Sequence, residues 1–184
     1  MFLRTTAINK MLDLDNGGAR VKCVPGGSSA GKTQGILPIL YDQAAKNPGD
    51  EISVVSETVP HLKKGAIKDF KGMMEDTNRW DRNKWNATDM KYSLDNGSFI
   101  EFFSADSHDK VRGPRRKTLY INECNRLSFE TYHQLAIRTS DSIWLDWNPT
   151  QDFWAYTELA NDEDTEWLTL TYKDNEALTH AIVK

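Results

Sequence analysis

The chain has 184 residues, 39% hydrophobic and 27% charged, a balance typical of one globular domain with a real core. Its apolar runs are too short to cross a bilayer and its start lacks the features of a secretory signal, so we expect a soluble, intracellular protein. A formal net charge of −4 argues against a surface that binds nucleic acid all over, so any DNA contact should be local.

The cysteines and histidines indicate neither a disulfide nor a zinc site. The two cysteines are Cys23 and Cys124, and without a secretory signal we expect both to be reduced thiols. The four histidines and two cysteines have no zinc-ligand spacing, so we predict no structural metal.

The most specific feature is a phosphate-binding loop at residues 26–33, which match G-x-x-x-x-G-K-[ST] at every fixed position. The predicted nucleotide-binding residues are Gly26, Gly27, Ser28, Ser29, Ala30, Gly31, Lys32 and Thr33. Backbone N–H groups of such a loop surround the phosphates, Lys32 adds positive charge, and the Thr33 hydroxyl ligates Mg²⁺. The loop therefore predicts a nucleoside triphosphate with Mg²⁺ as the ligand.

The neighbouring segments agree with this prediction. Residues 20–24 form a short β-prone run, and residues 34–45 carry apolar side chains at helical spacing. Strand, glycine-rich loop and helix follow in the required order, and the helix directs its N-terminus toward the phosphates. A chance match in a glycine-rich turn is the alternative.

The next elements alternate between strand and helix. Residues 52–56 are a predicted buried strand, and apolar residues at positions 62, 66, 70 and 73 predict one helix with a solvent-facing row of lysines. Two-residue alternation around a turn at 95–97 predicts a β-hairpin. Trp80 and Trp85 precede this hairpin, and packing is favoured over base stacking for both.

Residues 110–117 carry five cations around a Gly-Pro turn. Two interpretations remain open for this segment: a solvated loop, or a segment that contacts phosphate and includes an arginine finger.

The second half continues the alternation. Residues 118–123 form a predicted apolar strand with a polar end, 128–139 a helix, 142–147 a strand, and 167–172 a last strand. Strands that alternate with helices predict an α/β fold with a mainly parallel sheet covered on both faces.

The polar end of the 118–123 strand completes the predicted site. Triphosphatases need a carboxylate that positions the attacking water, at the end of a strand beside the phosphate loop, and Glu123 has that place. The residue before such a glutamate is generally an aspartate that helps to hold Mg²⁺, but here it is Asn122, which keeps an oxygen and lacks the charge. The alternative is that these two residues merely end a strand.

Four sequence blocks follow one another along the chain: residues 26–33, residues 119–125, residues 146–149 and residues 171–175. In this order they resemble the large terminase subunits of tailed bacteriophages. The likeness covers nearly the whole chain. It implies a P-loop ATPase of the additional-strand, catalytic-glutamate class with an inserted β-hairpin, as one ATPase domain over residues 1–184.

The resemblance also implies a function. Such proteins are motors that use ATP and Mg²⁺ to drive double-stranded DNA through a portal protein into a procapsid, together with a small terminase subunit, in the host cytoplasm. Subunits assemble as a homo-oligomeric ring on the portal and can be monomers in isolation; no membrane is involved. Asn148 falls in the family's coupling motif, which senses the γ-phosphate. An arginine from one subunit can complete its neighbour's site, and Arg112 is the first candidate, followed by Arg115 and Arg116.

Two departures from the family pattern qualify these expectations. Many members carry a basic residue inside the phosphate loop, where this chain has Ser28 and Ser29, so hydrolysis is expected to depend more on arginine in trans. Asn122 leaves the metal affinity open, and Asp146 would compensate if its strand lay alongside. The alternatives are a nucleotide-binding assembly module with little hydrolysis and another DNA-acting P-loop motor, such as a helicase or recombinase core.

Members of the family normally continue into a lid segment and a nuclease domain. The sequence stops just after the last of the four blocks, so we expect neither part here and assign no DNA cleavage to these residues.

Overall fold

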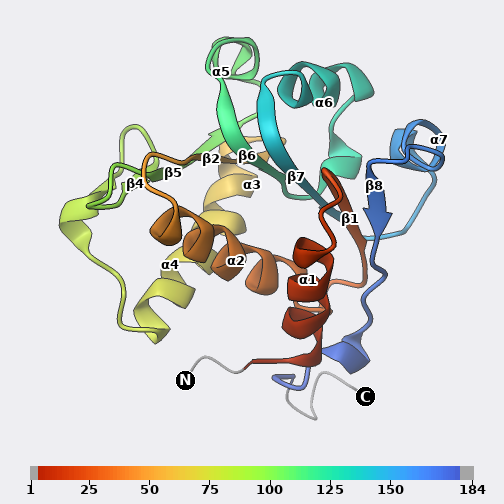
Figure 1. The fold of residues 1–184 in the computed structure, drawn as a ribbon, viewed down its shortest axis with the longest axis horizontal. Coiled ribbons are helices and arrows are strands. Elements are labelled where there is room, and N and C mark those ends of the chain that lie inside the picture. The colour runs from red at the N-terminus through yellow and green to blue at the C-terminus, as the bar shows by residue number, and fades with distance from the viewer. Residues whose placement is uncertain (1–3, 179–184) are drawn as a thin grey trace.

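One eight-stranded sheet forms the centre of the computed structural model, which describes residues 4–178 (Figure 1). The strands are β1 (Val21–Pro25), β2 (Glu51–Ser56), β3 (Trp85–Asn86), β4 (Lys91–Ser93), β5 (Phe99–Ser104), β6 (Arg116–Ile121), β7 (Thr139–Trp147) and β8 (Thr165–Trp167). Their order in the sheet is β3-β4-β5-β2-β6-β7-β1-β8. All pairs from β5 to β8 are parallel, whereas β3 and β4 add two antiparallel pairs at one edge.

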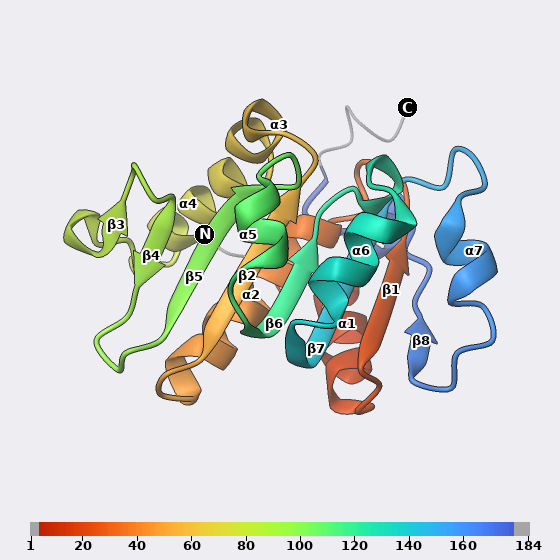
Figure 2. The ribbon, with the colours of Figure 1, turned by 90° about the horizontal axis from the view of Figure 1, so that it is seen from above.

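Helices cover both faces of the sheet (Figure 2). They are α1 (Thr6–Asn16), α2 (Lys32–Lys46), α3 (Val59–Lys64), α4 (Ala66–Asp76), α5 (His108–Arg112), α6 (Phe129–Ala136) and α7 (Trp154–Glu158). Helices α1, α2 and α4 lie on one face, while α5 and α6 lie on the other. The predicted α/β fold with a mainly parallel sheet is therefore confirmed.

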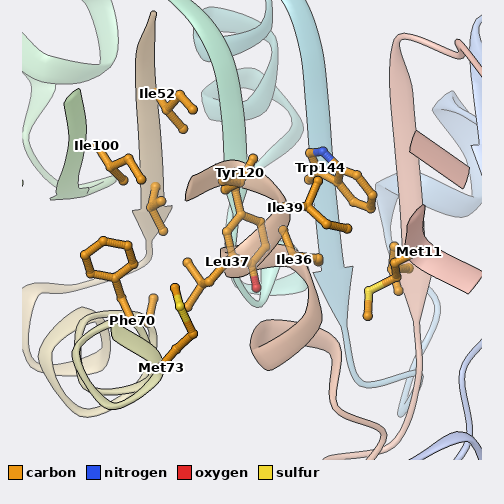
Figure 3. Packing of buried hydrophobic residues seen from close by; sticks show 14 of the residues in the cluster. Met11, Ile36, Leu37, Ile39, Ile52, Phe70, Met73, Ile100, Tyr120 and Trp144 are labelled. Carbon is orange, nitrogen blue, oxygen red and sulfur yellow. The ribbon is translucent and has the colours of Figure 1, made fainter. Parts of the chain in front are cut away.

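The central strands are buried on both faces, and their side chains alternate between two hydrophobic clusters. In β6, Tyr120 joins the cluster beneath α2, whereas Leu119 and Ile121 join the cluster beneath α6. Figure 3 shows Tyr120 and Trp144 of neighbouring strands facing Ile36 of α2. Strands buried on both faces explain why these segments read as nearly continuous apolar runs.

The strand order brings the two predicted halves of the site together. Strand β7 lies between β1, which leads into the phosphate loop, and β6, which leads into Glu123. In this register Val24 is opposite Asp146, and Ile121 is opposite Leu145. Because all three strands are parallel, their carboxyl ends meet at one edge, and β7 is the additional strand that the resemblance implies.

The predicted hairpin is also confirmed. Strands β4 and β5 pair antiparallel around a turn in which Gly97 has a φ of 86°. Trp80 and Trp85 pack on this unit: their ring centroids are 5.9 Å apart, and Trp85 lies 6.0 Å from Phe102. Packing, the favoured interpretation for both tryptophans, is what the structure shows.

Some predicted boundaries are wrong. The single helix predicted over positions 62–73 is two helices, α3 and α4, because the chain turns at Gly65, where a Cβ atom would lie 3.1 Å from the His61 carbonyl oxygen. Helix α6 ends at Ala136, three residues before the predicted end, since Thr139 already begins β7.

Both ends of the described chain also differ from expectation. Helix α1 was not predicted; it buries Ala7, Met11 and Leu14. The last strand, β8, ends at Trp167, where the predicted strand would begin. Beyond it the chain follows β1 to a single bridge at Leu170 and then turns, because Thr171 and Asp174 form a capping box.

Both cysteines, Cys23 and Cys124, are free, as predicted, and both are buried. None of the helices within residues 4–178 has the length and apolar character needed to cross a membrane.

Candidate nucleotide-binding and catalytic site

The phosphate loop joins the end of β1 to the start of α2. Gly31 has a φ of 79°, in the left-handed region that favours glycine, and directly precedes the first residue of α2, Lys32. The next turn of α2 lies close to α1, because a Cβ atom on Gly35 would fall 1.9 Å from Met11 Cε. Close packing of α1 thus fixes the helix whose N-terminus carries the loop.

The segment after β8 also contacts the phosphate loop. Asn175 Nδ2 donates to the Ser29 carbonyl oxygen at 2.9 Å, and Lys10 of α1 pairs with Asp174 at 2.7 Å. Gly26 lies so near Leu170 that a Cβ atom would fall 2.5 Å from the Leu170 carbonyl oxygen. The loop is therefore held by residues from both ends of the described chain.

Lys32 is bonded entirely to neutral oxygens. Its Nζ donates to the carbonyl oxygens of Gly26 at 2.6 Å and Gly27 at 2.9 Å, and to Asn148 Oδ1 at 2.9 Å. Asn148 Nδ2 in turn donates to Ser28 Oγ at 3.1 Å. Burial lowers the pKa of Lys32, while Asp146 and Glu123 oppose that shift. Phosphate oxygens can take over these contacts, because they are stronger acceptors for an ammonium group than carbonyl oxygens are.

A polar chain connects the loop to the end of β6. Asn122 Nδ2 lies 3.4 Å from Thr33 Oγ1, 3.3 Å from the Tyr120 hydroxyl and 3.1 Å from Asp146 Oδ1. Burial raises the pKa of Tyr120 well above its usual value, so this hydroxyl stays neutral. Thr33 and Asn122, the two predicted metal ligands, therefore lie side by side.

Asp146, at the end of β7, accepts a second bond from the backbone N–H of Glu123 at 2.8 Å. The residue is only 1% exposed, and burial raises its pKa to about 6, against the opposing effect of Lys32. Through Asp146, strand β7 holds the turn that carries Glu123.

Glu123 itself has a strained backbone, with a φ of 55° in the left-handed region. Its carboxylate accepts from Arg126 Nε at 2.7 Å and lies 4.0 Å from His61 Nδ1, while Arg126 also reaches Glu57 at 3.4 Å. Non-glycine residues in this conformation cluster at functional sites, where the surroundings enforce them.

Two adjoining cavities border the loop. One, of about 310 Å³, is lined by the loop residues Ser28, Ser29, Lys32 and Thr33. The other, of about 340 Å³, is lined mainly by α4, including Asp69 and Met73, together with Ile8 of α1. The first is polar enough for phosphates, and the second offers apolar walls with a few polar groups.

The residues present fit Mg²⁺ bound together with a triphosphate. Within residues 4–178, no group of three or more His, Cys, Asp or Glu side chains could hold a metal without help. Mg²⁺ prefers oxygen ligands, keeps several waters, and is usually held by one or two protein groups plus substrate phosphates. The Thr33 hydroxyl and the Asp146 carboxylate, which both contact Asn122 Nδ2, are oxygen donors of this kind.

A family model of the phage terminase large subunit matches residues 19–184. The chain belongs to the phage terminase large subunit family. No curated protein is similar enough to this terminase chain to count as a match.

Solved terminases share the fold of this terminase chain. The large terminase of a thermophilic bacteriophage superposes with a TM-score of 0.82 at 17% identity, over 98% of this chain and 49% of that one. The same terminase in complex with ADP gives 0.77 at 18% identity, over 97% and 48%. The large terminase ATPase domain of Thermus phage P74-26 gives 0.61 at 13% identity, over 92% and 80%. This terminase chain spans about half the length of the first of these relatives.

Burial separates Arg116 from the other two candidate arginines of this terminase. Arg116 is buried and donates to Ser53 Oγ at 3.0 Å and to the Leu135 carbonyl oxygen at 3.2 Å, so it is not available to a neighbouring subunit. Arg115 is exposed. Arg112, at the end of α5, is exposed and lies 3.8 Å from Glu130.

Sequence patterns do not identify several residues of the terminase site. Asn175 lies within a block that carried the resemblance, yet no role was assigned to it. Arg126, His61 and Asp69 carried no signal, because their approach to Glu123 or to the loop depends on how α3, α4 and the turn after β6 pack.

Proposed function

We propose that this chain is the ATP-hydrolysing motor part of a DNA-packaging terminase, which moves double-stranded DNA through a portal protein into a procapsid. The observation that supports this most directly is the continuous contact from Thr33 of the phosphate loop through Asn122 and Asp146 to the backbone of Glu123. A phosphate loop linked to a strand-end glutamate is the arrangement that triphosphate hydrolysis needs.

ATP binds with its phosphates in the loop cavity and its adenosine in the adjoining cavity lined by Ile8 and Met73. The thermophilic phage terminase has been solved in complex with ADP and with ATP-γ-S, which supports nucleotide binding by this chain. Lys32 exchanges its three neutral partners for phosphate oxygens and stabilises the charge that develops during hydrolysis. Mg²⁺, bound with the triphosphate at Thr33, supplies further charge neutralisation.

Glu123 orients the attacking water and accepts its proton. Its partner Arg126 is about as exposed as Glu123 itself, at 44% against 41%, so a shift of either side chain can free the carboxylate. Asn148 contacts both Lys32 and Ser28, so it registers whether the γ-phosphate is present and passes the change to β7.

The assembled state is part of this proposal. The chain acts in the host cytoplasm as one subunit of a homo-oligomeric ring on the portal, with a small terminase subunit as a further partner. The family membership and the likeness to the phage packaging motor structures support this setting. In the ring, Arg112 of one subunit completes the site of its neighbour.

Calorimetric titration with ATP-γ-S and Mg²⁺ tests the nucleotide site. Lys32→Ala should weaken binding by about 2 kcal/mol, because charge-assisted bonds to phosphate are lost. Lys46→Ala, an exposed change at the far end of α2, is the matched control and should bind like the parent. Equal affinity of Lys32→Ala and the parent would refute the phosphate-loop assignment.

A further inference from the structure

At the ends of β6 and β7, the carboxylate expected on one strand is found on the neighbouring strand. Asn122 stands where a carboxylate was expected, and Asp146 lies directly beside it at 3.1 Å. The register places Ile121 opposite Leu145, so Asn122 and Asp146 are the next facing pair. The site therefore retains one carboxylate, carried by the neighbouring strand.

The orientation of the Asn122 amide decides which residue can face a cation. Its Nδ2 points to Thr33 Oγ1 and to Asp146 Oδ1, while its Oδ1 accepts from Ser56 Oγ at 3.4 Å. The reversed amide would place its oxygen against the Asp146 carboxylate, where both atoms are acceptors. Asn122 thus presents N–H donors, not a ligating oxygen, toward Thr33.

Asp146 can present a free carboxylate oxygen, which Asn122 cannot. Among residues 4–178, both hydrogen bonds that it accepts go to Oδ1, from Asn122 and from the Glu123 backbone, which leaves Oδ2 for a further partner. The side chain is nearly fully buried, and the nearby Lys32 ammonium donates to Gly26, Gly27 and Asn148 instead. A buried carboxylate without a bonded cation is costly, and such groups are normally paired or bound to metal.

We propose that Asp146, and not Asn122, supplies the carboxylate that faces the metal of the bound nucleotide, and that Asn122 positions it. This inference rests on the proposed function, because the metal arrives with the triphosphate. Asn122 contacts Thr33 and Asp146 through the same nitrogen, so it sets the spacing between the hydroxyl and the carboxylate.

The test compares the affinity of the full chain for ATP-γ-S with Mg²⁺ and with EDTA, by calorimetry. In the parent, Mg²⁺ should tighten binding. Asp146→Asn should lower this metal-dependent gain at least about tenfold, the usual minimum effect of losing a group that supports a metal. The metal-free affinity should not fall, since a negative charge near the phosphates is removed. Asp141→Asn is the matched control on the same strand, exposed and 3.8 Å from Lys117, and should keep the full gain.

The double exchange Asn122→Asp with Asp146→Asn returns the carboxylate to β6 and should recover the gain. If Asp146→Asn alone fails to fold, the double variant still tests the inference. A recovered Mg²⁺-dependent gain in affinity supports the inference, and the absence of that gain contradicts it. A full gain in Asp146→Asn would overturn the inference while leaving the proposed function intact. Failure of the parent to bind ATP-γ-S at all would instead refute the proposed function.

Discussion

Glu123 combines a strained backbone with the proposed role of catalytic base. Its left-handed backbone conformation follows from the turn between β6 and the short 3₁₀ helix Cys124–Arg126, and the bond from its N–H to Asp146 holds that turn in place. The carboxylate is 41% exposed, and it is close enough to Lys32 of the loop to oppose the fall in the pKa of that lysine. Glycine would adopt this left-handed backbone conformation with less strain than glutamate does.

Two truncations of Glu123 measure this strain. Both Glu123→Gly and Glu123→Ala remove the carboxylate, but only glycine relieves the left-handed backbone. We expect the glycine variant to be more stable than the alanine variant by about 1 kcal/mol in free energy of unfolding. Urea denaturation without nucleotide checks this, and equal stability would mean that the backbone at this position is not strained.

At the scale of elements, the phosphate loop depends on the segment that follows β8. This segment continues along β1 through backbone bonds from Leu168 to Cys23 and from Leu170 to Pro25, and it ends with Asn175 on the loop. The loop is thus clamped between α1, α2 and a chain segment more than 140 residues away. The shape of the phosphate loop therefore depends on tertiary contacts as well as on its own sequence.

A pair of glycine substitutions in the loop tests this clamp. Gly26→Ala would place a Cβ atom 2.5 Å from the Leu170 carbonyl oxygen, whereas a Cβ atom on Gly27 meets nothing within 4 Å. We expect Gly26→Ala to cost about 1–3 kcal/mol of stability through overpacking, and Gly27→Ala to cost much less. Thermal unfolding of the two nucleotide-free variants provides the comparison. Equal costs would show that the segment after β8 does not press on the loop.

The same elements show what the sequence can and cannot predict. The loop at 26–33 and the hairpin turn at Gly97 depend on local backbone requirements, so residue type and spacing were enough to predict them. Helix α1 went unpredicted, and its packing needs Gly35 of α2 as a partner. The position of Asp146 beside Asn122 depends on the register of β6 against β7, which no local pattern specifies.

At the scale of the whole molecule, the proposed action of an arginine in trans depends on which basic residues are exposed. The loop contains Ser28 and Ser29 where the resemblance leads one to expect a basic residue. Arg116, one of the three candidate arginines, is enclosed between β2 and α6. Arg112 remains exposed on α5, with a partner at 3.8 Å that it can exchange.

Arg112→Ala should leave the ATP-γ-S affinity of the isolated chain unchanged, yet lower ATP hydrolysis in the assembled ring about 10³-fold, as removal of an arginine finger does. Arg115→Ala tests the other exposed candidate of the segment and should keep the parental rate; a comparable loss in Arg115→Ala alone would assign the role to Arg115 instead. Mixed rings sharpen the test: subunits with Lys32→Ala still provide Arg112, so adding them to Arg112→Ala subunits should restore part of the activity. No recovery on mixing would argue against action in trans.

The central claim is that Glu123 activates water for hydrolysis of the ATP held by the phosphate loop. Phosphate release by the chain, measured with portal-bearing procapsids and double-stranded DNA, tests it most directly, because the assay supplies any arginine in trans. Glu123→Gln keeps the shape of the side chain and removes its basicity, so we predict parental affinity for ATP-γ-S and a rate at least about 10²-fold lower. Phosphate release by Glu123→Gln at the parental rate would contradict the account.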